Sequence, residues 1–322
     1  MDVINKPLSK EGQVVNILYP AKNLHKSSRD LIQYLKKNRP FLNDLLLKSG
    51  AVLFRGFDIS TEEEFLNIKN TLAGTKLFNY VDGNSPRTKL TKDIYTSTEY
   101  PKEFSISLHS ELSYSHTWPQ NILFYCKVPP KKGGETPIAD CRLILKKLNL
   151  EIVAKFEKHG VKYTRYLRGK KGIGKSWMDT FETTDKRVVE RYCKDGNMDF
   201  YWEGDSLFLA HKGKGVAIHP VTGEKVWFNQ ANQFHPSSLQ EDIYEALQLM
   251  YSKNKSKYPQ YALFGNNDEI PVQYLKQITE LHFETAIKFK WQKGDVLLLD
   301  NMLMSHGRMP FEGERRICVS MY

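Results

Sequence analysis

The sequence predicts an α+β fold with a mainly β core, a sandwich or barrel with helices before and between its strands. Short apolar segments such as NILFYCKV (121–128) recur between turn-rich stretches, as strands do. Helical patterns are concentrated at the start and in isolated insertions. The chain has 322 residues, 40% hydrophobic and 12% aromatic, which is enough for one large domain or two small ones.

Five segments have the apolar spacing or the end signals of helices. Ser27 or Ser28 can cap the first, and two others begin with a capping box, Thr61 with Glu64 and Ser238 with Glu241. Gly74 is a stop signal, and Pro271 is a start signal. The expected helices cover residues 27–49, 61–74, 140–158, about 238–253 and about 271–282.

The expected strands are apolar or alternate between apolar and polar residues. They cover residues 51–57, the alternating segment within 104–119, 121–128, short pieces within 161–235, the segment after the turn at 291–294, and 315–322. Residues 75–103 are polar and turn-rich and contain DGNSPRTKL, which is more typical of a functional loop than of a linker.

Composition excludes several classes of protein. The formal charge is +10, but the lysines are spread out and no helix-turn-helix or zinc-finger spacing occurs, so we expect no nucleic-acid partner. Diffuse positive charge suits a small anionic cosubstrate or an acidic partner protein. The four cysteines form no C-x-x-C pair and indicate a reducing cytosol. No apolar run suggests a membrane span or a secretory signal, so we expect a cytoplasmic protein.

A histidine and a carboxylate lie two residues apart in FSISLHSELSYSHTWP (104–119). On a strand, His109 and Glu111 would point to the same face, and Ser110 would point away. Two histidines and a carboxylate suit Fe(II) chemistry with O₂, and zinc is the rival. With 9 histidines and 37 acidic residues in 322, about one H-x-[DE] is expected by chance. A second instance, His282 with Glu284, lies at a probable helix end, where we interpret His282 as structural.

The C-terminal segment supplies the missing parts of such a site. In VLLLDNMLMSHGRMPFEGERRICVSMY, a buried strand leads to a turn with His306, and the last strand begins with Arg315 and Arg316. His306 can complete a metal triad, and an arginine can pair bidentately with a carboxylate of an oxo acid.

Seven segments, in order over roughly residues 80–320, resemble the taurine dioxygenase-like (TauD/TfdA) family of Fe(II)/2-oxoglutarate-dependent oxygenases. The SyrP-like branch, associated with natural-product biosynthesis, is the nearest. The segments are SPRTKL, YTSTEYP, ISLHSELSYSHTWPQNILFYC, GGETPIADCR, SWMDTFET, HPVTGEKVWFNQ and DNMLMSHGRMPFEGERR.

The resemblance implies a double-stranded β-helix (jelly roll) with flanking helices and insertions. It implies one domain over residues 1–322, with a helical part to about residue 75 and the core from about 76. It also implies that His109, Glu111 and His306 hold Fe(II).

The resemblance further implies that 2-oxoglutarate chelates the iron and that its distal carboxylate binds Thr136 and a C-terminal arginine. Aligning on RRI favours Arg316 as that arginine. Aligning on the apolar residue two positions later favours Arg315, and Arg308 could contribute. Adjacent strand residues face opposite ways, so only one of Arg315 and Arg316 can point inward.

The implied reaction uses O₂ to oxidise a C–H bond, most simply by hydroxylation, of an amino acid or derivative that is free or tethered to an acidic carrier protein. Related halogenases lack the carboxylate ligand, so Glu111 argues against halogenation, while desaturation and cyclisation stay open. The alternatives are a catalytically silent jelly-roll binding protein and a zinc hydrolase on a similar barrel.

Candidate substrate residues are Arg87 in the polar loop, Arg165, and the amides Asn229 and Gln230 in VWFNQANQFHP. The amides could equally satisfy loop backbone. We interpret His116 and His219 as structural. KGIGKSW (171–177) lacks the preceding strand and spacing of a phosphate loop, and we interpret it as a lid.

Overall fold

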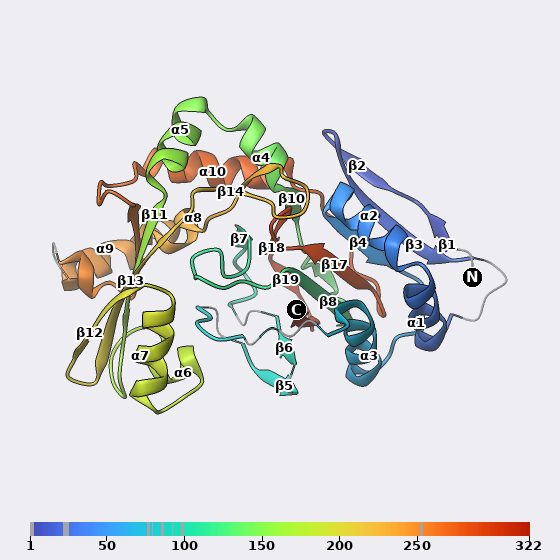
Figure 1. Cartoon of the computed structure of the whole chain (residues 1–322), viewed down its shortest axis with the longest axis horizontal. Coiled ribbons are helices and arrows are strands. Elements are labelled where there is room, and N and C mark those ends of the chain that lie inside the picture. The colour runs from blue at the N-terminus through green and yellow to red at the C-terminus, as the bar shows by residue number, and fades with distance from the viewer. Residues whose placement is uncertain are drawn as a thin grey trace.

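The computed structural model describes residues 3–21, 26–75, 78, 80–84, 87–91, 93–97, 100–251 and 254–322 (Figure 1). Its largest sheet has nine strands in the order β1-β3-β4-β17-β8-β20-β6-β5, with β2 paired to β3. All pairings are antiparallel except β3 with β4. The strands are β1 Val3–Asn5, β2 Leu8–Lys10, β3 Gln13–Pro20, β4 Ala51–Phe54, β5 Lys89–Thr91, β6 Ile94–Thr96, β8 Asn121–Val128, β17 Val296–Asp300 and β20 Arg316–Met321.

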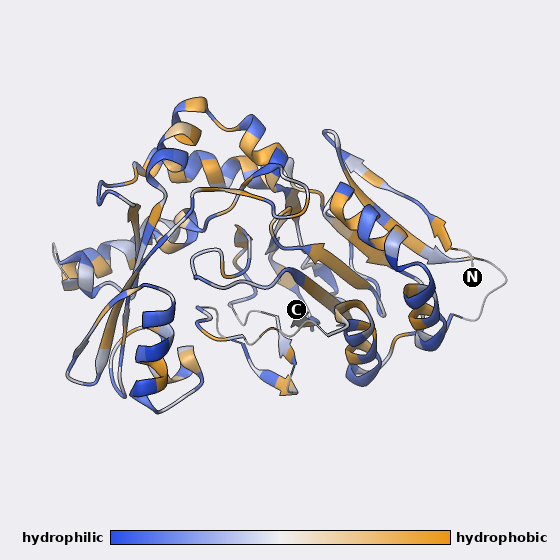
Figure 2. Ribbon diagram, in the orientation of Figure 1, coloured by the Kyte–Doolittle hydropathy of each residue, from blue (hydrophilic) through white to orange (hydrophobic). Residues whose placement is uncertain are grey.

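Alternate residues of the central strands serve two different cores. In β8, Leu123 and Tyr125 face a core shared with helices α1 Ser28–Lys37, α2 Arg39–Ser49 and α3 Glu62–Ala73. Ile122 and Phe124 point to the opposite core. Central strands buried on both faces lack polar alternation, which explains their continuous apolar sequence (Figure 2). Each such leucine or phenylalanine contributes about 1.5–3 kcal/mol through burial.

A smaller sheet lies across the second core. It pairs β10 Ile138–Asp140 with β18 Met304–Arg308, and β18 with β7 Ile106–His109. Apolar residues of this sheet, such as Leu108 and Met304, join Phe124 and Leu299 of the large sheet in one cluster. The two sheets therefore form the layers of a sandwich, and β7 and β18 lie side by side near its centre (Figure 1).

Helices and further strands surround the sandwich. A four-stranded sheet has the order β12-β13-β11-β16, and β14-β15 and β9-β19 form two small ribbons. Their bounds are β9 Lys132–Gly133, β11 Val161–Leu167, β12 Asp199–Glu203, β13 Ser206–Gly213, β14 Val216–Ile218, β15 Lys225–Trp227, β16 Gln260–Phe264 and β19 Phe311–Glu312. The helices are α4 Cys141–Lys147, α5 Leu150–His159, α6 Trp177–Phe181, α7 Lys186–Asp195, α8 Ala231–Phe234, α9 Glu241–Tyr251 and α10 Val272–Thr285, with short 3₁₀ turns at Pro236–Ser238 and Lys255–Lys257. Within the described residues, every helix is too short or too polar to cross a bilayer.

Several expected elements differ from the structure. The predicted helix 27–49 is two helices that meet at Asn38, because Pro40 sits in the first turn of α2 and lacks the N–H that a continuous helix needs. The predicted helix 140–158 is also two, α4 and α5. The segment 161–235, in which only short strands were expected, also contains helices α6, α7 and α8.

The two predicted capping boxes have different outcomes. The box at Thr61 and Glu64 is confirmed, and α3 ends at Gly74 as expected. The box at Ser238 is wrong, because Ser238 lies in a 3₁₀ turn and α9 begins only at Glu241. The expected end of that helix, near residue 253, lies outside the described residues.

The first 75 residues are not only helical, as the sequence suggested. They also contribute β1 to β4 to the large sheet, and β4 pairs directly with β17. Helices α1 to α3 and strands β1 to β4 lie together on one side of the molecule (Figure 1).

Candidate metal centre

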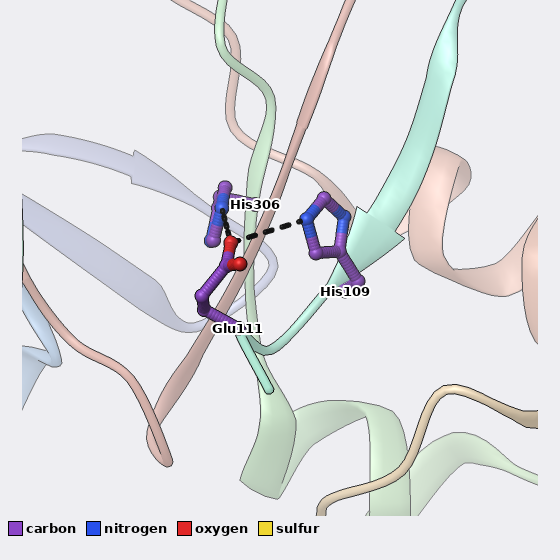
Figure 3. A group of neighbouring side chains, drawn as sticks. All are labelled: His109, Glu111 and His306. Carbon is purple, nitrogen blue, oxygen red and sulfur yellow. Dashed lines mark ion pairs between the residues drawn. The ribbon is translucent and has the colours of Figure 1, made fainter. Parts of the chain in front are cut away.

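The three predicted ligands converge in the structure (Figure 3). His109 is the last residue of β7, and His306 is its partner across the ladder in β18. Oε2 of Glu111 lies 3.8 Å from Nε2 of His109 and 3.9 Å from Nε2 of His306. All three side chains are buried, and among the described residues they are the only group of three or more such side chains with metal-ligand spacing.

The prediction that Glu111 lies on the same strand as His109 is wrong. β7 ends at His109, and Glu111 begins a turn in which Leu112 adopts a positive φ of 56°. The turn is held by Asn301, whose Oδ1 accepts from Glu111 N at 2.7 Å and whose Nδ2 donates to Glu111 O at 2.9 Å. The amide of Asn301 therefore fixes the backbone that carries the carboxylate.

Both imidazoles present Nε2 to the carboxylate. Nδ1 of His109 lies 2.9 Å from the Ser107 carbonyl and 3.0 Å from Nε2 of Gln233, so neighbouring groups engage Nδ1 and orient the ring with Nε2 toward the carboxylate. The same amide nitrogen of Gln233 donates to Ser107 O at 2.8 Å and so holds the carbonyl that contacts the His109 ring. Burial, reinforced by the neighbouring His109, holds the pKa of His306 well below its usual value. His306 is thus suited to bind a cation as a neutral ligand, with Nε2 of His109 beside it.

Two further groups engage the carboxylate of Glu111. Nη2 of Arg87 donates to Oε2 at 2.7 Å, and the hydroxyl of Tyr80 donates to Oε1 at 3.1 Å. Burial alone would raise the pKa of Glu111, but Arg87 and the two imidazoles hold it well below its usual value. Glu111 is therefore ionised at neutral pH and brings one negative charge to the site.

This donor set fits a divalent metal. Two neutral imidazole nitrogens and one ionised carboxylate, all buried and within 4.8 Å of one another, are the ligands of the facial triad of non-haem iron sites. Nδ1 of His306 is buried and has no hydrogen-bond partner among the described residues.

Arg315 and Arg316 point in opposite directions. Arg315 donates to Gly134 O at 2.9 Å, Ser97 Oγ at 3.1 Å and Thr136 Oγ1 at 3.4 Å, all of which are neutral. Arg316 pairs with Glu314 at 3.1 Å at the surface. Burial, with Arg308 nearby, lowers the pKa of Arg315 to about 10, so it stays charged at neutral pH.

Two cavities share Arg87 as a wall, and the narrower one is lined by two of the three predicted ligands. A narrow one, about 30 Å³, is lined by side chains that include His109, His306, Thr136, Arg308 and Arg315. A wider one of about 710 Å³ opens beside Tyr80 and Lys175. Arg87 lines both cavities and therefore lies at the boundary between them.

Other predicted residues lie outside these cavities or support backbone. Arg165 is buried in an ion pair with Asp82. Nδ2 of Asn229 donates to Gly215 O at 2.8 Å, and its Oδ1 accepts from Ala231 N. Nε2 of Gln230 donates to Oε1 of Gln233 at 2.8 Å, and Gln233 in turn contacts His109, so Gln230 touches the candidate ligand only through Gln233.

The histidines interpreted as structural stay away from the triad. Nε2 of His219 lies 3.2 Å from Oδ2 of Asp300, and the ring of His116 packs against that of Tyr192 with a tilt of 57°. His282 is buried in the last turn of α10, where its Nδ1 donates to Ile278 O at 2.7 Å.

Sequence reasoning missed three residues that shape the site: Asn301, Tyr80 and Gln233 in its role beside His109. The DN pair after the VLLL strand was the available signal for Asn301, because an asparagine directly after a buried strand usually satisfies nearby backbone. No local pattern marks Tyr80, whose hydroxyl meets Glu111 through tertiary packing.

Comparison with known proteins gives matches over most of the chain. Residues 20–322 match the Taurine catabolism dioxygenase TauD, TfdA family. The dapdiamide synthesis protein DdaC of Enterobacter agglomerans is 38% identical over 87% of this chain and 84% of its own. A clavaminate synthase-like protein of Arabidopsis thaliana is 31% identical over 90% of this chain and 86% of its own.

Solved structures share the fold at low identity. The PvcB protein of Pseudomonas aeruginosa superposes with a TM-score of 0.55 at 14% identity, over 99% of this chain and 90% of its own. A taurine dioxygenase from Burkholderia xenovorans gives 0.51 at 16% identity, over 99% and 88%. The predicted jelly-roll core with added helices is confirmed. From the match over residues 20–322 and the two relatives above 30% identity, the chain belongs to the TauD/TfdA family and is a 2-oxoglutarate-dependent dioxygenase.

Proposed function

We propose that this enzyme uses Fe(II), 2-oxoglutarate and O₂ to hydroxylate an unactivated C–H bond of an amino acid or amino-acid derivative in natural-product metabolism. The relative DdaC is named for dapdiamide synthesis, which supports a substrate of this class. The substrate is free or tethered to an acidic carrier protein, for which the formal charge of +10 is favourable.

The observation that carries this proposal is the half-buried Arg315, which has only neutral hydrogen-bond partners among the described residues. No described carboxylate lies within ion-pair distance of its guanidinium, although the side chain lines the cavity beside the triad. A buried cation without a counter-charge is costly, and an anionic ligand in the cavity would remove that cost. Arg308, buried and bonded to backbone carbonyls, adds a second positive charge beside it.

Under this proposal the residues have separate tasks. His109, Glu111 and His306 would hold Fe(II), and Arg315 with Thr136 would bind the distal carboxylate of 2-oxoglutarate. The bound metal supplies the oxidising chemistry by which one oxygen atom of O₂ enters the substrate C–H bond, while the other enters 2-oxoglutarate as it becomes succinate and CO₂. Surrounding apolar walls, such as Phe124 and Val319, exclude water from the cavity.

Arg87 is the proposed link between cosubstrate and substrate. Its Nη2 holds Glu111, while Nε and Nη1 are buried and without partners among the described residues. The narrow cavity of about 30 Å³ must widen to admit 2-oxoglutarate, and Arg87 is a wall that it shares with the wider cavity. A shift of this side chain would widen the first cavity and turn its free donors toward a substrate.

Glu111 also bears on the outcome of the reaction. Because its carboxylate occupies a ligand position, it leaves no place there for a halide, and hydroxylation is the expected outcome. Desaturation and cyclisation of a bound radical substrate use the same ligand set and differ in product mass.

The test is turnover in ¹⁸O₂. The Fe(II)-loaded protein is incubated with 2-oxoglutarate and a panel of amino acids and short peptides, and succinate and products are measured by mass spectrometry. We expect substrate-dependent succinate and a product carrying one ¹⁸O, and neither with the Glu111→Ala variant. Metal-loaded protein that never converts 2-oxoglutarate, or that hydrolyses a probe when loaded with zinc, would overturn the proposal.

A further inference from the structure

The wider cavity contains a lysine that the triad does not explain. Lys175 precedes α6, in the segment that the sequence suggested as a lid, and lines the cavity together with Tyr80 and Arg87. Its Nζ donates to the carbonyl of Gly83 at 2.6 Å. No described carboxylate lies within ion-pair distance, so its one hydrogen-bond partner in the described part of the chain is neutral.

The carboxylates around Lys175 are already engaged by other groups. Glu182 pairs with Lys89 at 2.9 Å, and Asp82 pairs with Arg165. Oδ2 of Asp179 accepts from the hydroxyl of Ser176 at 2.5 Å.

Lys175, Arg87 and Arg168 line this cavity together with Asp179 and Glu182, of which Glu182 is paired with Lys89. Burial, followed by the nearby Arg165 and Arg87, outweighs the opposing charges of Asp179 and Asp82 and lowers the pKa of Lys175 to about 8. A cation with a lowered pKa in a cavity wall is stabilised when an anion binds next to it.

The segment that carries Lys175 is built to hold it in place. Nε of Arg168 donates to Gly174 O at 2.8 Å, and its Nη1 donates to Gly169 O at 3.0 Å, so one guanidinium ties both ends of the loop. Opposite, the segment carrying Gly83 is fixed by Tyr114, whose hydroxyl donates to Asp82 O at 2.8 Å. The ammonium group thus projects between two braced segments.

The cavity also leads from Lys175 to the metal ligands. Tyr80 and Arg87 line it, and these two side chains contact the two oxygens of Glu111. A molecule anchored at Lys175 would extend over Tyr80 and Arg87 toward the triad, which is the geometry an oxygenase needs to attack a carbon remote from the anchored group.

We propose that Lys175 binds the carboxylate of a free amino acid or short peptide, so that the substrate enters as a free acid and not as a thioester on a carrier protein. An aminoacyl thioester has no carboxylate at that carbon and would leave the ammonium group unpaired. This inference rests on the proposed oxygenase function and selects between the two forms of substrate that it leaves open.

The experiment measures the acetylation rate of Lys175. Protein loaded with Mn(II), with and without 2-oxoglutarate, is treated anaerobically with trace acetic anhydride, and the peptide containing Lys175 is quantified by mass spectrometry. The exposed Lys171 of the same segment is the internal reference. The probes are the standard amino acids and their alanyl dipeptides, each compared with its carboxamide and its N-acetylcysteamine thioester.

We expect at least one free acid to slow acetylation of Lys175 without affecting Lys171. Its carboxamide and thioester should need about tenfold higher concentrations, the difference made by a hydrogen bond to a charged group. In calorimetric titrations, Lys175→Met should bind the protecting acid about tenfold more weakly than the wild type, Lys175→Arg should retain part of the affinity, and Lys171→Met should bind it like the wild type.

Two results would overturn the inference: no free acid protects Lys175, or the thioester or carboxamide protects as well as the acid. Calorimetry on the same samples measures the affinity for 2-oxoglutarate. That affinity tests the proposed oxygenase function independently of the inference about Lys175. Acid-selective protection in a protein that does not bind 2-oxoglutarate would overturn the oxygenase proposal and leave the anion site intact.

Discussion

Replacing Arg315 by methionine should sharply weaken the binding of 2-oxoglutarate. The guanidinium is fixed by Gly134 and Ser97, while its contact with Thr136 Oγ1 is long at 3.4 Å, so Nη2 is the donor most available to a ligand. Losing one partner of a buried charge pair costs about 2–5 kcal/mol, and a value of about 3 kcal/mol corresponds to roughly 150-fold in Kd. Calorimetric titration of 2-oxoglutarate into the Mn(II)-loaded protein measures this directly.

The neighbouring arginine is the matched control. Arg316 lies at the surface and pairs with Glu314, so Arg316→Met should change the Kd for 2-oxoglutarate by less than about twofold. Arg315→Lys keeps the positive charge but loses the bidentate guanidinium. Its Kd for 2-oxoglutarate should therefore lie between those of Arg315→Met and the wild type. A strong loss in Arg316→Met with none in Arg315→Met would refute the reasoning.

Three further predictions concern the metal ligands and the buried histidines. Glu111→Ala should abolish tight Mn(II) binding, and Asn301→Ala, which frees the Glu111 turn, should weaken it by about 10- to 100-fold; unchanged affinities in a metal titration would contradict these roles. Burial lowers the pKa of both His282 and His235 from 6.5 to about 4. The unfolded chain therefore takes up these protons first as the pH falls, and stability should decline between about pH 6.5 and pH 4, by up to about 2.7 kcal/mol per pH unit for the pair. Urea unfolding at several pH values measures this slope, which His282→Gln should roughly halve; a flat profile would contradict the assignment.

Elements with strong local signals were predictable from the sequence. β8 runs from Asn121 to Val128 as expected, because both of its faces are buried and every position favours a strand. α7 was missed although its buried residues, Val189 and Cys193, lie four apart, as residues on one face of a helix do. The division of 27–49 into two helices depends on Pro40, whose position in the sequence already favours a helix start at that point.

The spacing of His109 and Glu111 predicted that these two candidate ligands lie together, but not how Glu111 reaches the site. The strand argument correctly put His109 and Glu111 on the same side, yet Glu111 reaches the site from a turn that Asn301 holds. The inward direction of Arg315 depends on where β20 begins relative to its partner, since the register shifts between Arg316 and Ile317. Lys175 faces the cavity because a loop folds back over Gly83, and such long-range packing leaves no periodic trace in sequence.

The central claim is that His109, Glu111 and His306 hold an iron that 2-oxoglutarate chelates through two oxygens. Anaerobic addition of Fe(II) and then 2-oxoglutarate, followed by visible absorption spectroscopy, tests it most directly. We predict a weak metal-to-ligand charge-transfer band that needs both additions and is absent in Glu111→Ala. A wild-type protein that binds Fe(II) and yet shows no such band at saturating 2-oxoglutarate would contradict the account.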